Sequence, residues 1–126
     1  MLVPFALIIE DDEDLAIIFT KALEVAEFKV EIIHDGQIAL ERLANTIPNV
    51  VVLDLHLPHV SGPDILRQIR ADPRLAETRV ILATADPILA DVLNDEADLV
   101  LLKPISFDQL SAFARRLRPP DIMMNE

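Results

Sequence analysis

The stretch VVVLD, residues 50–54, decides how this chain folds. Four consecutive apolar residues end in Asp54, and a short, wholly apolar run of this kind is typical of a parallel strand that is covered on both faces. A second such run, residues 6–9, ends in Glu10 and Asp11. Parallel strands bring their carboxyl ends to one edge of the sheet, where ligands bind. The sequence therefore predicts a cluster of carboxylates at that edge.

Further apolar runs alternate with segments of helical periodicity, the pattern of βαβ units. We expect an α/β protein with a doubly wound, five-stranded parallel sheet that carries helices on both faces. The strands are expected at residues 5–9, 29–33, 49–54, 79–84 and 98–102.

The helix starts are marked by capping residues: Asp12 or Asp14 for the first helix, Ser61 or Gly62 for the third, and Ser106 for the fifth. The helical spacing of apolar residues predicts which side chains face the sheet. In chain order these are Leu15, Ile18, Phe19, Ala22, Leu23 and Ala26; Ile38, Leu43 and Ala44 with Leu40 or Ala39; Ile65, Leu66 and Ile69; Ile88, Leu89, Val92 and Leu93; and Phe107, Leu110 and Leu117 with Phe113 or Ala114.

Composition narrows the function classes. The 126 residues suffice for one domain, and a formal net charge of −11 argues against contact with nucleic acid phosphates. The absence of cysteine excludes disulfides and thiolate metal sites and fits a reducing cytoplasm. The first apolar stretch lacks a basic flank and stops at Glu10, too early for a signal peptide or a membrane span.

Two further polar residues end predicted strands, Thr84 and Lys103. Together with the three carboxylates they form a set that suits phosphoryl chemistry. A carboxylate such as that of Asp54 can accept a phosphoryl group as an aspartyl phosphate. Phosphoryl transfer needs mainly positioning and charge neutralisation. A Mg²⁺ ion held by Glu10, Asp11 and Asp54 would supply charge, with Lys103 and Thr84 meeting the phosphoryl oxygens.

Four short segments, in this order and spacing, carry a family resemblance: IIEDDEDL (8–15), VLDLHLP (52–58) followed by Ser61-Gly62, LATA (82–85) and LLKP (101–104). Through them the chain resembles the receiver domain of two-component response regulators. The resemblance covers about residues 5–118 and implies a flavodoxin-like sheet with strand order 2-1-3-4-5. Residues 1–118 are thus the expected receiver domain, and residues 119–126 a tail or the start of a linker.

The resemblance implies that Asp54 accepts a phosphoryl group from a sensor histidine kinase or a phosphotransfer protein, and that a protein-interaction surface then switches. It implies no enzyme activity beyond the chain's own phosphorylation and dephosphorylation. It also implies a cytoplasmic location and no contact with nucleic acid or membrane, and it is compatible with a homodimer. The other implied roles are metal binding by Glu10, Asp11 and the backbone carbonyl of His56, switching by Thr84, and phosphate contact by Lys103, whose bond to Pro104 is expected to be cis.

The chain departs from the family pattern in three places. Val100 stands where the family usually carries an aromatic residue that rotates inward on activation. The interval from Thr84 to Lys103 is shorter than usual, so we expect a shortened fourth helix. His56 is uncommon at its position. An exposed loop side chain is the simpler interpretation, and the alternative is that it overhangs the phosphoryl group and tunes its hydrolysis.

Other interpretations remain. A phosphorylation-independent docking module of the same fold is favoured by Val100 and the short fourth helix. A phosphatase of the haloacid dehalogenase type is disfavoured, because His56 replaces the acidic residue that it needs. Asp12 is better explained as a helix cap than as a ligand, and His34 and His59 show no functional pattern. Arg115, Arg116 and Arg118 are most simply a solvated face near a helix end.

Overall fold

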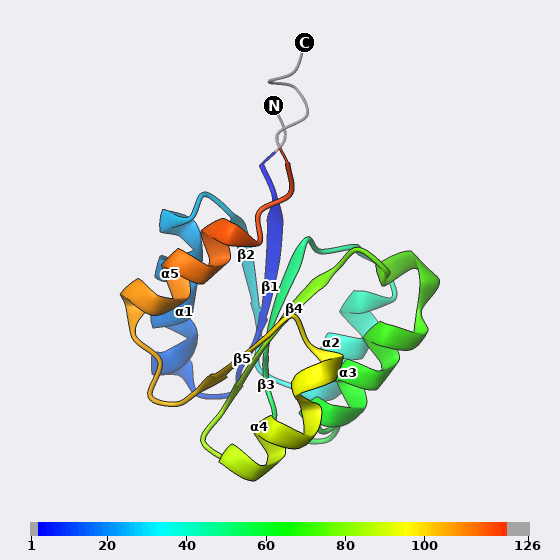
Figure 1. Cartoon of the computed structure of the whole chain (residues 1–126). Coiled ribbons are helices and arrows are strands. Elements are labelled where there is room, and N and C mark those ends of the chain that lie inside the picture. The colour runs from blue at the N-terminus through cyan, green and yellow to red at the C-terminus, as the bar shows by residue number, and fades with distance from the viewer. Residues whose placement is uncertain (1–2, 121–126) are drawn as a thin grey trace.

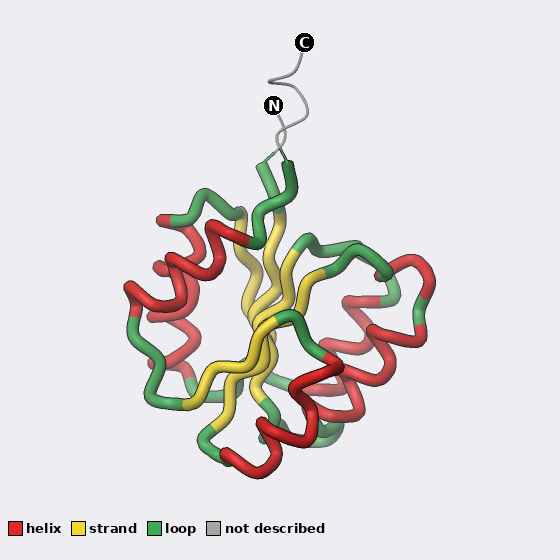
Figure 2. The backbone as a smooth tube through the Cα atoms, viewed as in Figure 1, coloured by secondary structure: helices red, strands yellow, loops and turns green. Residues whose placement is uncertain are grey.

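The computed structural model describes residues 3–120, and it forms one five-stranded parallel sheet with helices on both sides (Figures 1 and 2). The strand order β2-β1-β3-β4-β5 confirms the predicted fold class and topology. Residues 121–126 of the expected tail lie outside the described residues. The strands are β1 (Phe5–Ile9), β2 (Lys29–Ile33), β3 (Val50–Asp54), β4 (Arg79–Thr84) and β5 (Leu99–Leu102).

Helices α1 and α5 cover one face of the sheet, and α2, α3 and α4 cover the other (Figure 1). None of the helices within residues 3–120 is long and apolar enough to cross a membrane. The helices are α1 (Glu13–Val25), α2 (Gly36–Leu43), α3 (Gly62–Ala71), α4 (Pro87–Leu93) and α5 (Phe107–Arg116), with 3₁₀ turns η1 (Pro73–Leu75) and η2 (Asn94–Glu96).

The strands divide their side chains between two buried clusters because successive residues of a strand point to opposite faces. In β1, Ala6 and Ile8 join the cluster under α1 and α5, while Leu7 and Ile9 join the cluster under α2, α3 and α4. β3 alternates in the same way, and all five of its residues are buried. The apolar runs of the sequence are thus explained by burial on both faces.

Capping side chains fix where the helices begin. The Asp12 carboxylate accepts the Leu15 N–H at 3.0 Å and starts α1. Ser106 accepts the Gln109 N–H at 3.0 Å and starts α5, and Ser61 caps α3. These caps confirm three of the predicted helix starts. They also place each helix immediately after the loop that leaves the carboxyl edge of the sheet.

The predicted inward faces were wrong at several apolar positions. Alanines are buried in four of the helices: Ala16 and Ala22 in α1, Ala39 in α2, Ala90 in α4 and Ala114 in α5. Ala22 was predicted to face inward and Ala39 and Ala114 were alternatives, whereas Ala16 and Ala90 were missed. The exposed exceptions are Ile18, Ile38, Ala44, Ile88, Val92 and Phe107.

Helix α4 is short, as expected: it has 7 residues and continues only as the turn η2. Leu93 is buried and Leu89 half-buried, whereas Ile88 is 77% and Val92 67% exposed. Val100 of β5 is half-buried against the same apolar cluster as Leu93. Few large side chains therefore hold α4 to the sheet.

The start of α3 is packed directly onto the backbone that follows Asp54. A Cβ atom on Gly62 would collide with the Asp54 carbonyl oxygen and the Leu55 Cα. The Gly62 N–H also donates to the Leu55 carbonyl at 3.2 Å. The hydrogen bond holds the two backbones together, and the close approach leaves no space for a side chain at residue 62.

We predict that Gly62→Ala destabilises the protein, although alanine favours helices by about 1 kcal/mol over glycine. The collision should lower the free energy of unfolding by roughly 1–3 kcal/mol, as measured by urea denaturation. Gln68→Ala, at an exposed position of the same helix, is the control and should change it by less than about 0.5 kcal/mol. An increase in stability for Gly62→Ala would show that the contact is not rigid.

Candidate functional site

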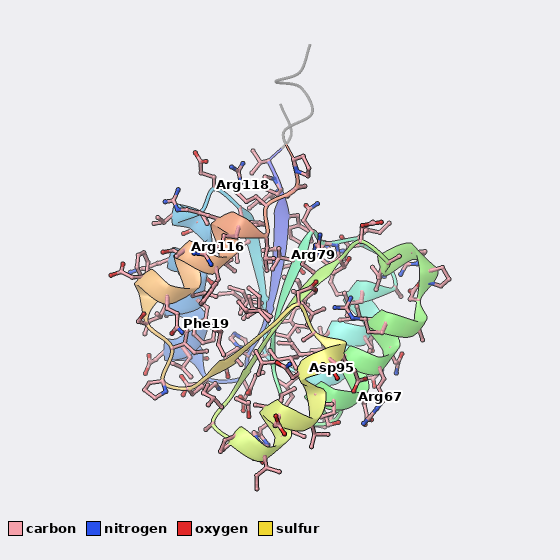
Figure 3. The ribbon with its side chains drawn as sticks, in the orientation of Figure 1. Phe19, Arg67, Arg79, Asp95, Arg116 and Arg118 are labelled. Atoms are coloured by element: carbon pink, nitrogen blue, oxygen red, sulfur yellow. The ribbon has the colours of Figure 1, made fainter. Side chains whose placement is uncertain are left out.

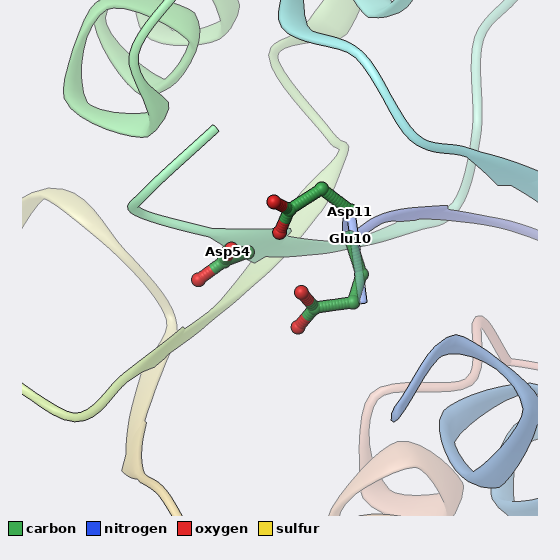
Figure 4. Close-up of side chains that lie close together, drawn as sticks. All are labelled: Glu10, Asp11 and Asp54. Atoms are coloured by element: carbon green, nitrogen blue, oxygen red, sulfur yellow. The ribbon is translucent and has the colours of Figure 1, made fainter. Parts of the chain in front are cut away.

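Three carboxylates meet at the carboxyl edge of the sheet, as the strand-end rule predicted (Figure 4). Glu10 and Asp11 follow β1, and Asp54 is the last residue of β3. One oxygen of each carboxylate lies within 4.8 Å of the other two. Glu10 is 1% and Asp54 3% exposed, whereas Asp11 is exposed. Two of the three charges are therefore removed from water.

Lys103 bridges the two buried carboxylates from the far side of β4. Its Nζ atom lies 3.0 Å from Glu10 Oε1 and 3.2 Å from Asp54 Oδ1. The residue directly follows β5, and its backbone N–H donates to the Thr84 carbonyl at 2.8 Å. The bond to Pro104 is cis, as the resemblance implied. The ammonium group is thus held where it can meet an oxygen bonded to Asp54.

Burial and the neighbouring charges shift the pKa values of Glu10 and Lys103. Burial raises the pKa of Glu10 to about 7, because the carboxylate leaves water and the Asp54 charge adds to the effect, against the opposing hydrogen bond from Lys103. For Lys103, partial burial alone would lower the pKa. The hydrogen bond to Glu10 and the charges of Asp54 and Glu10 outweigh it, so the pKa of Lys103 is raised and the ammonium stays charged.

Thr84 links the site to α4. Its side chain is fully buried at the end of β4, and its Oγ1 accepts the Asp86 N–H at 3.0 Å. Asp86 in turn caps α4 by accepting the N–H groups of Ile88 and Leu89 at 3.0 and 3.1 Å. The Thr84 hydroxyl keeps its own proton to donate. An acceptor beside Thr84 could take this proton, and any rotation of the side chain toward that acceptor would weaken the contact with the Asp86 N–H at the start of α4.

No pattern in the sequence singled out His34 or His59, yet each makes a specific contact with another element. His34 Nδ1 donates to the Glu10 carbonyl oxygen at 2.8 Å. The His59 ring contacts the carboxylate of Asp35, which caps α2. His34 directly follows β2, so the strand-end rule that selected Thr84 could have found it. The side chain of His56 is exposed, and the role of its carbonyl stays a prediction.

The carboxylates suit a small hard cation. Mg²⁺ prefers oxygen ligands at about 2.0–2.1 Å, so oxygens on opposite sides of one ion lie about 4.2 Å apart. The carboxylate oxygens of Glu10, Asp11 and Asp54 lie within 4.8 Å of one another and would have to draw closer around such an ion, since adjacent ligands in an octahedral shell are about 2.9 Å apart. Three carboxylates and one ammonium leave a formal charge of −2 when all are ionised. The donor set and the charge both fit a divalent ion.

Comparison with known proteins decides the family. The family model described as "Response regulator receiver domain" matches residues 6–115. The chain belongs to the response regulator receiver family. This receiver domain is 30% identical over 123 residues to the probable methanogenesis regulatory protein FilR2 of Methanothrix harundinacea, covering 89% of this chain and 79% of that protein.

Other similarities agree. The domain is 35% identical over 119 residues to the DNA-binding response regulator MtrA of Mycolicibacterium paratuberculosis, covering 91% of this chain and 52% of that protein. The solved signal receiver domain of a putative Luxo repressor protein from Vibrio parahaemolyticus superposes with a TM-score of 0.81 at 29% identity, covering 92% of this chain and 93% of that chain. The receiver domain spans about half the length of several curated relatives.

We predict that the metal-free receiver domain loses stability as the pH rises from 4.5 to about 7. In that interval the unfolded chain releases the Glu10 proton while the folded chain retains it, so the free energy of unfolding falls with pH. At about 1.4 kcal/mol per pKa unit, the loss is on the order of 2–3 kcal/mol. Urea denaturation in the presence of a chelator measures it.

Glu10→Gln should remove most of the dependence of the free energy of unfolding on pH, because the amide does not titrate. Glu41→Gln changes an exposed glutamate of α2 in the same way and should retain it. Equal slopes in the wild type and Glu10→Gln would mean that Glu10 is not the titrating group.

Proposed function

We propose that this receiver domain accepts a phosphoryl group on Asp54 from a sensor histidine kinase or a phosphotransfer protein, in a Mg²⁺-dependent reaction, and then changes a protein-interaction surface. The main support is the position of Lys103, whose ammonium lies 3.2 Å from Asp54 Oδ1 in an otherwise acidic site. Such a cation can neutralise an oxygen of the incoming group. Apart from promoting its own phosphorylation and dephosphorylation, the domain acts by binding.

The chain's own residues divide the chemistry. A carboxylate oxygen of Asp54 attacks the phosphorus, an acyl phosphate forms, and the bond to the donor histidine nitrogen breaks. Lys103 and the Thr84 hydroxyl meet the transferred oxygens. Mg²⁺, held by Glu10, Asp11, Asp54 and the His56 carbonyl, would supply further positive charge. Because the pKa of Glu10 is about 7, metal binding near neutral pH would release part of a proton from this residue.

The setting follows from the same proposal. We assign residues 1–118 to the receiver domain and place it in the cytoplasm, a reducing compartment that suits a chain with no cysteine. With a net charge of −11, the domain itself is not expected to bind nucleic acid, although the name of the similar MtrA describes that whole protein as DNA-binding. Its output partner and any homodimer would use the protein surface.

We predict that a small phosphodonor modifies Asp54 alone and only with Mg²⁺ present. Intact-mass spectrometry should show one phosphoryl adduct in the wild type, labile to base as an acyl phosphate is, and none in Asp54→Ala. Asp64→Ala, at an exposed aspartate of α3, should be labelled like the wild type. An adduct on Ser61 or Thr84, or labelling that does not depend on Mg²⁺, would contradict the assignment.

A phosphorylated Asp54 can act on α4 through Thr84. If the hydroxyl turns to a phosphoryl oxygen, its contact with the Asp86 N–H weakens, and Asp86 is the cap of α4. Val100 carries no ring that could rotate in response, and α4 has few large side chains holding it to the sheet. Free energy from the phosphoryl contacts would therefore be expressed mainly in residues 85–93.

We predict that amide exchange changes in residues 85–93 on treatment with a phosphoryl mimic, with little change in residues 98–105. Thr84→Ala should still bind the mimic but lose most of the change, whereas Thr84→Ser, which keeps a hydroxyl, should retain it. A response confined to residues 98–105 would place the moving element in the fifth strand. No response anywhere would favour the phosphorylation-independent docking module.

A further inference from the structure

A pocket of about 290 Å³ lies at the opposite edge of the sheet, where the strands begin. It opens between the starts of β3 and β4 and the end of α5. Three arginines line it, Arg79, Arg116 and Arg118, and Figure 3 shows them at the end of the molecule where α5 ends. Glu77 is the one acidic residue of the lining. Three guanidinium groups at one pocket stand out in a chain with a net charge of −11.

Most N–H donors of the three arginines are not used in hydrogen bonds among the described residues, since each guanidinium carries five N–H bonds. Arg79 uses Nη1 to contact Asp98 at 3.1 Å. Arg118 Nη1 lies 3.4 Å from a Glu27 oxygen, and its buried Nε has no hydrogen-bond partner among the described residues. A buried donor without an acceptor is unfavourable, so an acceptor at this place would be stabilising.

Arg116 is the most available of the three. No carboxylate within residues 3–120 forms an ion pair with it. Its guanidinium carbon lies 5.5 Å from the centre of the Phe113 ring. Stacking on a ring uses the face of the guanidinium and leaves its N–H edge free.

A neighbouring arginine shows what a purely structural role looks like. Arg70 donates to the Glu96 carbonyl at 2.7 Å, the Thr78 carbonyl at 3.1 Å and the Asp98 carboxylate at 3.0 Å. Its three nitrogens are all engaged, and they tie α3 to the starts of β4 and β5. The arginines of the pocket lack such a set of acceptors, which distinguishes them from Arg70.

We propose that this pocket binds a small oxyanion, a phosphate or carboxylate group, through the N–H edges of Arg79, Arg116 and Arg118. Guanidinium groups match both anions geometrically because paired N–H bonds meet paired oxygens. The carboxyl end of α5 and Glu77 contribute negative charge that opposes an anion. Asp98 and Glu27 also compensate part of the charge of Arg79 and Arg118, so Arg116 supplies the uncompensated cation and the affinity is modest.

The pocket is separate from the acidic site, since the length of the strands lies between them. Its wall includes Pro119 and Pro120, the residues that follow α5. A bound anion would therefore join the end of α5 to the starts of β3 and β4 without touching Asp54. This separation allows the two sites to be tested independently.

The test is a titration of ¹⁵N-labelled full chain, without Mg²⁺, with sodium phosphate and in a separate arm with sodium acetate, each matched in ionic strength by sodium chloride. We expect saturable shifts of the amides of residues 77–79 and 116–118, with residues 84–86 and 103 unchanged. Saturation by phosphate alone identifies a phosphate site, saturation by acetate alone a carboxylate site, and saturation by both a site for either anion. Equal shifts with sodium chloride, or no saturation, would overturn the proposal.

Two variants with the same change of charge complete the test. Arg116→Gln should weaken binding about tenfold, the loss expected for one charge-assisted hydrogen bond. Arg67→Gln, on the exposed side of α3, should leave the affinity unchanged. If the arginines serve only to offset the dipole of α5, the two variants will bind alike or neither they nor the wild type will bind, and the proposal fails.

Discussion

Lys103 is the counter-ion of two buried carboxylates, and the rest of the site depends on this pairing. Glu10 and Asp54 are almost wholly shielded from water. In such a buried environment like charges repel strongly. The ammonium reaches them from β5, past β4, at 3.0 and 3.2 Å. The three groups come from three different strands. The pairing therefore forms only when the sheet has its full order, and an intact sheet in turn leaves the site balanced between attraction and repulsion.

This balance explains how one small site can respond to added charge. In the proposed function, a divalent cation would add positive charge beside Asp11, and a phosphoryl group would add negative charge beside Lys103 and Thr84. Binding of the cation or of the phosphoryl group would change which charged groups of the site neutralise one another. Because the Thr84 hydroxyl already holds the Asp86 N–H at 3.0 Å, a redistribution of charge has a short route to the start of α4.

The sheet and the composition of the site could be predicted because they follow from simple rules. Residues 5–9, 29–33 and 79–84 were expected as strands and are strands. For 5–9 and 79–84 the reason is that a run buried on both faces has a distinctive composition. Polar residues that end such runs must share an edge, which brought Glu10, Asp54 and Lys103 together in advance. The short α4 was also foreseen from the reduced interval between Thr84 and Lys103.

The helix faces and the individual contacts were harder to predict. Hydrophobic periodicity allows two neighbouring phases: it placed Ile38 inward and left Leu40 or Ala39 open, and the structure buries Ala39 while Ile38 is 55% exposed. The choice depends on how closely a helix can approach the sheet, which is a property of the assembled fold. Likewise, the hydrogen bond from His34 to the Glu10 carbonyl joins residues 24 apart in sequence. The end of β2 places His34 at this edge of the sheet but does not tell which group it contacts.

The two glycines of the chain both lie against the loop between β3 and α3. A side chain on Gly36 would strike the Val60 carbonyl, just as one on Gly62 would strike that of Asp54, and the Gly36 N–H donates to the Pro58 carbonyl at 3.2 Å. The loop is thus closely packed on two sides, and no space is left there for added residues. Engineered insertions should be tolerated poorly there and better around α4, the same side on which this chain already differs in length from its family.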